Sequence, residues 1–275
     1  MSLVLLTPFD LALAAVLVLL LAAMSWYLHL GVERRLLIAA ARSTVQLMLV
    51  GLVLKALFAQ TNPWLIGLMA LFMLAVAGIE VLQRQKRRFR GPWGYGIGAF
   101  SMFISSFSVL FLTLTLIIRV EPWYQPQYLI PLLGMLLGNT MSGAAIALDT
   151  LTRGAWDARG RIEARLLAGG TWDQAIASLR RDSLRAGLIP IVNAMATAGL
   201  VSLPGMMTGQ ILAGSPPMEA AKYQLLMMFV ISAGTGLGSV AAVWLGSRRL
   251  FDERERLRLD RLRDPGRDQG RDRGN

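Results

Sequence analysis

Long apolar runs with few or no charged residues constrain this chain more than any other feature of its sequence. A helix needs roughly 18–25 apolar residues to cross the hydrocarbon core of a bilayer. Seven runs of that kind are present: 11–30, 36–58, 63–82, 94–118, 129–148, 186–203 and 223–246. Hydrophobic residues make up 55% of the chain, which is more than a soluble core of this size can bury. The sequence therefore predicts an all-α polytopic membrane protein, with seven transmembrane helices in one membrane domain covering residues 1–250.

The connections between these runs alternate between rich and poor in basic residues. Of the 28 Lys and Arg residues, 24 lie after the first, third and fifth runs or in the C-terminal tail. The opposite connections hold only Arg119 and Lys222, while Arg42 and Lys55 lie inside the second run. Because positively charged loops stay in the cytoplasm, we expect the N-terminus outside and the C-terminus in the cytoplasm. The first run has no basic residue before it and no small-x-small site before Arg34, so we interpret it as a span rather than a signal peptide.

The remaining composition excludes several classes of function. The net charge of +11 collects at the ends of the apolar runs, so topology explains it and nucleic acid is not expected as a partner. With no Cys and only His29, the chain cannot form disulfides, thiolate metal sites or multi-histidine sites, and the residues of any metal site stay unknown. The preference for Arg over Lys is typical of a GC-rich bacterial genome, so the expected lipid bilayer is the inner (cytoplasmic) membrane of a bacterium.

Residues 152–185 are the one polar connection long enough to fold as an element of its own. A first short helix is expected near Trp156–Leu167, followed by a break at Gly169-Gly170. Thr171, with Gln174 three residues later, is a capping box that predicts the start of a second short helix. The apolar residues of that helix share one face: Ala175, Ile176 and Leu179. Periodicity leaves two roles open for this amphipathic hairpin, which either lies in the lipid interface or presents its stripe to a protein partner.

The tail, residues 251–275, alternates Arg with Asp or Glu and becomes rich in Gly. This pattern predicts a short charged helix that frays into disorder. Its expected role is to anchor the chain beside acidic lipid head groups, and a specific docking role is the alternative.

Polar side chains inside the apolar runs are costly and are therefore functional candidates. The candidates are Arg42, Gln46, Glu80, Asn139, Asp149 and Asn193. We favour a structural interpretation in which Arg42 pairs with Glu80 or Asp149 and holds helices in register. The alternative is that Arg42, together with Gln46, Asn139 and Asn193, belongs to a substrate pathway or gate.

Residues 204–214 are uncharged and rich in Gly, on the side of the membrane predicted to be external. They form either an external turn or a non-helical re-entrant segment that lines a cavity, shielded from lipid. We favour the second interpretation because an exposed loop of this length normally carries more charge. The pathway and gating candidates here are Pro204, Gly205, Met206, Met207, Gly209 and Gln210, the two glycines being expected to permit close backbone approach.

The string Pro-Gly-Met-Met-Thr-Gly-Gln-Ile-Leu-Ala-Gly at 204–214, with Ala220, Tyr223 and Gln224 after it, resembles the signature of the FetB-type permeases. These are membrane subunits of bacterial ABC transporters associated with iron export, and they are similar to plant aluminium-tolerance half-transporters. Two further strings agree with the family in the same order, 41–47 with Gly51 and 138–141. The resemblance therefore covers nearly the whole chain except the charged tail.

The resemblance implies an ATP-driven transporter subunit rather than an enzyme. ATP and Mg²⁺ would be held by a separate FetA-like ATPase subunit, and this chain would bind no cofactor; indeed none of its three Lys is followed by Ser or Thr, so it has no phosphate-binding loop. The hairpin also resembles the EAA-type coupling loop of ABC importers, although Arg165 replaces the second Ala and the Ile-x-Leu-Pro ending is missing. The coupling residues implied are Glu163, Ala164, Gly169, Gly170, Gln174 and Ala175.

ABC systems use paired halves, so the resemblance also implies a homodimer that encloses a shared pathway. No cluster of carboxylate, His or Cys ligands suits iron, so the substrate is either chelated iron or another metal-related compound. Two rival functions are weighed against this one. A stand-alone ion-coupled secondary transporter would need internal repeats with broken helices, and a membrane-embedded enzyme would need catalytic residues converging at one depth.

Overall fold

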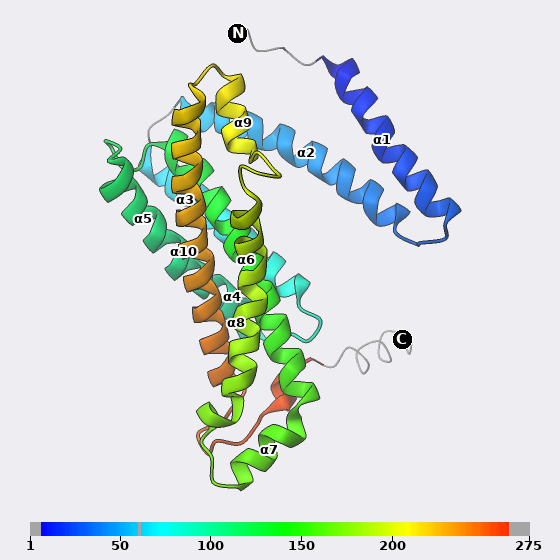
Figure 1. Cartoon of the computed structure of the whole chain (residues 1–275), viewed down its shortest axis with the longest axis vertical. Helices are drawn as coiled ribbons and strands as arrows, with labels where there is room; N and C mark the ends of the chain where they lie inside the picture. The colour runs from blue at the N-terminus through cyan, green and yellow to red at the C-terminus, as the bar shows by residue number, and fades with distance from the viewer. Residues whose placement is uncertain (1–6, 60–61, 264–275) are drawn as a thin grey trace.

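The computed structural model describes residues 7–59 and 62–263, and all regular secondary structure in these ranges is helical (Figure 1). The α-helices are α1 (Pro8–Tyr27), α2 (Glu33–Phe58), α3 (Pro63–Arg84), α4 (Pro92–Met102), α5 (Ser108–Leu112), α6 (Pro126–Asp157), α7 (Arg159–Leu167), α8 (Trp172–Thr197), α9 (Gly205–Leu212) and α10 (Pro217–Arg249). Two π-helical stretches, η1 (Phe103–Phe107) and η2 (Thr113–Ile118), continue α4 and α5, and η3 (Leu259–Arg261) is a short 3₁₀ turn. The prediction of an all-α membrane protein is therefore confirmed at the level of fold class.

The core of the bundle is the junction of α6, α8 and α10, which run side by side along the long axis (Figure 1). Small residues line this junction. A Cβ atom placed on Gly143 of α6 would lie 2.6 Å from the Thr235 side chain of α10, and one on Gly187 of α8 would lie 2.7 Å from the Gly143 carbonyl oxygen. Ser239 is completely buried beside both glycines. The three backbones approach closely because these positions carry almost no side chain, which is how helices pack in a bilayer.

Six helical segments are long and apolar enough to cross a membrane within the described ranges: α1, α2, α3, the continuous segment Pro92–Ile118, α6 and α10. The predicted sixth span, 186–203, has different bounds. It is the second half of the 26-residue helix α8, which begins at Trp172 and ends at Thr197. Pro190 lies inside this helix without ending it. The expected second hairpin helix and the expected sixth span are thus one helix, α8. Because its first half is charged, α8 is not among the six segments that are long and apolar enough to cross a membrane.

The capping box that begins α8 is confirmed, since Thr171 and Gln174 exchange side-chain hydrogen bonds with each other's backbone N–H. The stripe that follows it was interpreted wrongly. Ala175, Ile176 and Leu179 face neither lipid nor a partner, because they are buried inside the chain as part of the hydrophobic core. Their partners come from the end of α6, which extends to Asp157, and from α7. The hairpin therefore uses its apolar stripe for its own folding.

The tail was also predicted wrongly as far as it is described. Residues 251–263 form turns rather than a charged helix, with antiparallel bridges Phe251–Leu257 and Phe89–Leu262. The Arg90 N–H donates to the Arg261 carbonyl oxygen over 2.8 Å, which fastens the segment to the connection between α3 and α4. The physical reason is apolar burial, because Leu262 is almost completely buried where it pairs with Phe89. The predicted disorder of residues 264–275 lies outside the described residues.

The N-terminal hairpin of α1 and α2 leans away from the bundle (Figure 1). Only Ala22 and Ser25 of α1 and Leu57 of α2 are buried, although both helices are strongly apolar. Helix α1 packs on α2, whereas α2 makes few contacts with the bundle, with α6 and, through the side chain of Arg42, with α3. This arm consequently presents apolar faces that only lipid or another protein surface can cover.

Replacing Gly143 by Val is expected to destabilise the fold by about 1–3 kcal/mol, because the new side chain overpacks the junction of α6, α8 and α10. The matched control is Gly138→Val on the same helix, where a Cβ meets no other atom within 4 Å. Thermal unfolding of the detergent-solubilised protein measures the difference. Equal melting temperatures for the two variants would contradict the proposed close approach.

Candidate functional site

One face of the membrane-spanning part of the bundle carries an ion pair that is not enclosed by the chain. Arg42 Nη2 of α2 lies 3.2 Å from Glu80 Oε1 of α3, and the two side chains are 57% and 27% exposed. On the same α3 helix, Arg84 Nη1 donates to Ser142 Oγ of α6 over 3.1 Å. An ion pair inside the hydrocarbon region is expensive to expose to lipid. This face of α2, α3 and α6 therefore calls for cover by protein or by a water-filled space.

Asp149, the other partner that the sequence allowed for Arg42, interacts with different groups. Its Oδ1 accepts the Lys86 backbone N–H over 2.7 Å, and its Oδ2 lies 3.3 Å from Arg153 Nε one turn further along α6. Asp149 thus ties the connection after α3 to α6. Of the two pairings that the sequence allowed, the structure forms the one with Glu80.

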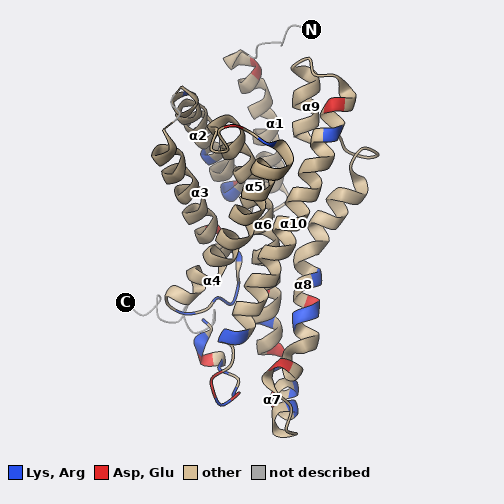
Figure 2. Cartoon of the chain, turned by 90° about the vertical axis from the view of Figure 1, so that its left-hand side faces the viewer, with Lys and Arg blue, Asp and Glu red and all other residues tan. Residues whose placement is uncertain are grey.

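The other intramembrane candidates differ in position. Gln46 is exposed on α2, one turn after Arg42, and Asn139 is exposed on α6, where its Nδ2 donates to the Met135 carbonyl oxygen over 2.9 Å. Asn193 is exposed on α8, a different helix of the bundle. The charged residues gather at the α7 end of the bundle and are sparse through its middle, as Figure 2 shows. The few polar groups in the middle are therefore the natural candidates for contact with a substrate.

Residues 204–214 are mainly helical, which overturns the non-helical segment expected from their glycines. Pro204 is the N-cap of α9, and the helix packs against α10. A Cβ atom at Gly205 or Gly209 meets nothing within 4 Å, so neither glycine makes the expected close approach within this chain. The helix forms because most of its residues are ordinary helix formers and Gly205 occupies the first turn, where its cost is low. Met206, Met207 and Gln210 are half-buried, and Gln210 Oε1 has no hydrogen-bond partner among the described residues.

The coupling residues implied by the resemblance divide into two groups. Glu163 and Ala164 are exposed on α7, and Gly169 is exposed in the turn between α7 and α8, where it adopts a φ of +86° that favours glycine. Gly170 is half-buried. Gln174 serves the capping box and is exposed, whereas Ala175 is buried at 2% exposure and so is not on a docking surface.

Two parts of this end of the molecule were missed from the sequence. Leu167, the last residue of α7, is 89% exposed. A groove of about 640 Å³ lies between α7 and the C-terminal turn. Glu163 and Gly169 line it on the α7 side, and residues 254–257 line it on the other side. The sequence signalled Leu167 as an apolar residue among charged neighbours. The C-terminal turn gave no signal, because its place beside α7 depends on long-range contacts.

No group of three or more His, Cys, Asp or Glu residues that could hold a metal ion occurs in residues 7–59 and 62–263. The ligands of any metal site therefore stay unknown.

A helical bundle with six membrane-length segments and an intramembrane ion pair defines a multi-pass membrane protein. The chain belongs to the uncharacterised protein family UPF0014, whose profile matches residues 8–251.

Relatives in bacteria and plants match over most of their length. The chain is 34% identical over 259 residues to the probable iron export permease protein FetB of Escherichia coli (strain K12), covering 92% of this chain and 96% of the relative. It is 34% identical over 252 residues to the UPF0014 membrane protein YjkA of Bacillus subtilis (strain 168), covering 90% and 97%. It is 32% identical over 234 residues to the protein ALUMINUM SENSITIVE 3 of Arabidopsis thaliana, covering 85% and 84%. No solved structure gave a significant match.

Replacing Arg42 by Ala is expected to lower the yield of folded protein, because it leaves Glu80 without its partner on a membrane-facing surface. A lone charged side chain at the centre of a membrane helix costs roughly 2.5–3.5 kcal/mol on insertion scales. Adding Glu80→Gln in the same chain should restore much of the yield, measured as monodisperse protein by size-exclusion chromatography. Arg34→Ala, at the beginning of the same helix, is the control. Independent, additive losses from the two substitutions would show that the pair is not coupled.

Proposed function

We propose that this protein is the membrane-spanning permease subunit of an ABC transporter that exports iron or a metal-related substrate. The observation that carries the proposal is its 34% identity, over 92% of the chain, to a relative named as a probable iron export permease. In this proposal the chain is not an enzyme and binds no cofactor. ATP and Mg²⁺ are held by a separate FetA-like ATPase subunit.

The proposed orientation puts the N-terminus outside and the C-terminus in the cytoplasm of a bacterial inner membrane. The clustering of Lys and Arg at the α7 end supports it (Figure 2), because basic connections stay in the cytoplasm. The α7–α8 turn then faces the compartment where ATP is available. Helix α8 forms the proposed sixth span of seven, with its charged first half projecting from the membrane.

The proposed ATPase dock is a composite of the α7–α8 turn and the C-terminal turn. Leu167 supplies an exposed apolar side chain, and the groove beside it has charged residues on both walls, Glu163 on one and Arg254 and Arg256 on the other. An apolar anchor with a polar rim is the usual composition of a binding surface. Because α6 and α8 continue from this end into the membrane without a break, a push on the turn would move both helices as rigid rods.

The proposed active form is a homodimer. The Arg42–Glu80 face and the loosely attached α1–α2 arm both need cover, and a second copy can supply it while enclosing a polar pathway between the two chains. Gln46 and Asn139 would line that pathway. The absence of a three-ligand cluster in the described residues favours a chelated or otherwise complexed metal over a bare ion.

A stand-alone ion-coupled secondary transporter remains the alternative function. The Arg42–Glu80 pair favours it to the extent that intramembrane carboxylates often serve as coupling groups. Dependence of transport on a co-expressed ATPase subunit separates the two, because the secondary transporter needs none.

Leu167→Glu is expected to weaken binding of the ATPase subunit by roughly tenfold or more, since it places a charge at the apolar anchor of the dock. Leu200→Glu is the matched control, because Leu200 is 90% exposed at the opposite end of the bundle. Co-purification and stimulated ATP hydrolysis are the measurements, with membrane insertion checked in parallel. A double variant, Glu163→Ala with Gly169→Val, should likewise lose stimulation. Unchanged binding and hydrolysis in both variants would refute the docking role.

Asn139→Cys is expected to react with an impermeant thiol reagent at a rate that changes when ATP is trapped on the complex. The chain has no Cys, so single substitutions give clean labelling. Thr208→Cys and Gln210→Cys test α9 in the same way, and Leu200→Cys is the reference that should label equally in both states. Identical labelling of Asn139→Cys with and without trapped ATP would place it outside the pathway.

A further inference from the structure

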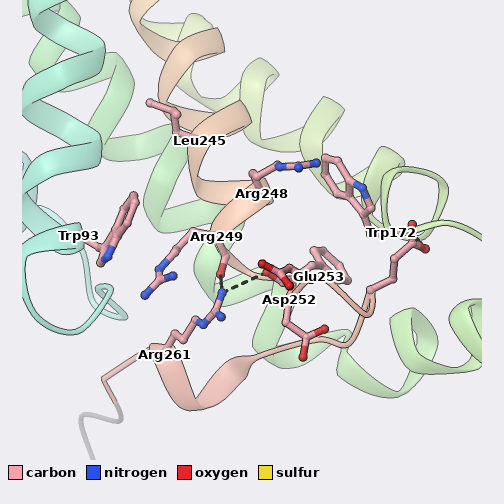
Figure 3. Close-up of a pocket in the computed structure, with 10 residues that line it drawn as sticks. Trp93, Trp172, Leu245, Arg248, Arg249, Asp252, Glu253 and Arg261 are labelled. Atoms are coloured by element: carbon pink, nitrogen blue, oxygen red, sulfur yellow. Dashed lines mark hydrogen bonds between the residues drawn. The ribbon is translucent and has the colours of Figure 1, made fainter.

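Three arginines converge on a pocket where α10 ends. Arg248 and Arg249 occupy the last turn of α10, and Arg261 approaches from the C-terminal turn (Figure 3). The pocket has a volume of about 580 Å³ and is flanked by Trp93 at the start of α4 and Trp172 at the start of α8. Figure 3 shows Arg248 extended toward Trp172 and Arg249 on the side of Trp93.

These guanidinium groups carry charge that nothing in the described part of the chain neutralises by direct pairing. Arg248 lies over the Trp172 ring at 5.7 Å and Arg249 over the Trp93 ring at 4.5 Å, instead of forming ion pairs. Arg261 Nη1 donates to the carbonyl oxygens of Arg249 (2.8 Å) and Phe251 (3.1 Å), which fixes its position without cancelling its charge.

Two carboxylates of the pocket, Asp252 and Glu255, are engaged away from the three arginines, and the third, Glu253, forms no ion pair with any of them in the described part of the chain. Asp252 Oδ2 lies 2.8 Å from Arg256 Nη2, and backbone and side-chain hydrogen bonds from Arg256 lower the pKa of Asp252 to about 2. Glu255 Oε2 accepts the Trp172 backbone N–H over 3.1 Å. The arginine side of the pocket is therefore suited to an anionic group from outside the chain.

A second hollow begins where this pocket ends. It is a groove of about 320 Å³ between α4 and α10, lined by Pro92, Trp93, Gly96, Ile97, Phe100 and Leu245. Trp93 and Leu245 line both hollows. From Trp93 to Phe100 the helix rises about 10 Å, at 1.5 Å per residue, away from the arginines and along the membrane-spanning segment. The groove is thus an apolar extension of a basic pocket, directed from a helix end into the bilayer.

We infer that the two hollows form one binding site for an anionic phospholipid. The phosphodiester would lie among Arg248, Arg249 and Arg261, because guanidinium groups bind phosphate through paired charge-assisted hydrogen bonds. Trp93 is the second residue of the membrane-length segment Pro92–Ile118, and indole rings favour such positions at the ends of membrane helices. One acyl chain lies along Gly96, Ile97 and Phe100. A soluble phosphate would leave this groove empty, and an acidic protein side chain could not fill it.

The site also has a structural consequence, which is independent of the proposed transport function. It joins α4, α10 and the C-terminal turn, so a bound lipid fastens that turn to the bundle. In the proposed orientation the lipid belongs to the cytoplasmic leaflet.

The test measures lipid retained by the purified full-length protein in native mass spectrometry, with phosphatidylglycerol and phosphatidylcholine titrated separately. Arg248→Gln with Arg249→Gln is expected to weaken phosphatidylglycerol binding roughly thirtyfold, about fivefold for each charge lost near an acidic lipid. Phosphatidylcholine binding should change little. Arg181→Gln with Arg185→Gln, on exposed positions of α8, is the control of equal charge and should retain the lipid.

The groove is tested separately by Gly96→Leu, which should weaken binding of the same lipid without affecting folding. Gly96 lines the groove, and a Cβ atom there meets nothing within 4 Å, so the added side chain has room to enter the groove. Gly51→Leu on α2, where the surroundings are equally open, is the matched control. Glycerol 1-phosphate is added as a soluble competitor and should displace little lipid at equal concentration.

Four results would overturn the inference. These are unchanged lipid binding in the double arginine variant, an equal loss in the α8 control, unchanged binding in Gly96→Leu, and full competition by glycerol 1-phosphate. If the first result came with loss of ATPase association in the double arginine variant, the pocket would be a protein interface.

Discussion

The close approach of α6, α8 and α10 at Gly143, Gly187 and Ser239 is the contact on which the rest of this structure depends. Lipid tails are as apolar as leucine, so helices in a bilayer gain little from burying apolar side chains and depend on tight van der Waals packing instead. Here the small residues bring three long helices together along the middle of the bundle. Two of them, α6 and α8, extend beyond the packed junction, and α7 with the exposed Leu167 connects their ends.

The α1–α2 arm at the periphery of the bundle is not held by such close helix packing. The α1–α2 arm has strongly apolar helices and almost no buried residues, and it stands beside a face with an ion pair of which Arg42 is more than half exposed. Lipid can cover the apolar surface of the arm at no cost in free energy, but covering the charged groups of Arg42 and Glu80 with lipid is unfavourable. A surface that combines both properties suits contact with another chain or with an aqueous pathway. The α1–α2 arm and the Arg42–Glu80 face are therefore where the proposed dimer and its substrate would meet.

The sequence predicted the features that arise locally. Apolar runs located the membrane helices, and Thr171 with Gln174 located the start of α8, because run length and capping chemistry depend on a few neighbouring residues. It could not show that the second hairpin helix and the run 186–203 are one continuous helix, α8, with Pro190 in its interior, where α8 packs against α6 and α10. The sequence showed the apolar stripe of Ala175, Ile176 and Leu179, but it did not show that α6 and α7 cover this stripe. The turn at 251–263 and its pairing with residues 88–90 depend entirely on contacts between distant segments.

The C-terminal turn contributes residues to two surfaces whose connection is not visible in the sequence. Glu255 lines both the groove beside α7 and the arginine pocket, and its carboxylate binds the first N–H of α8. Residues 254–257 form one wall of the proposed dock, while Arg261 reaches into the proposed lipid site. A ligand that orders this segment on one side lowers the cost of ordering it on the other, and such coupling is reciprocal by thermodynamic necessity. Lipid composition and ATPase binding would therefore influence each other through one short stretch of chain, without any contact between the two ligands.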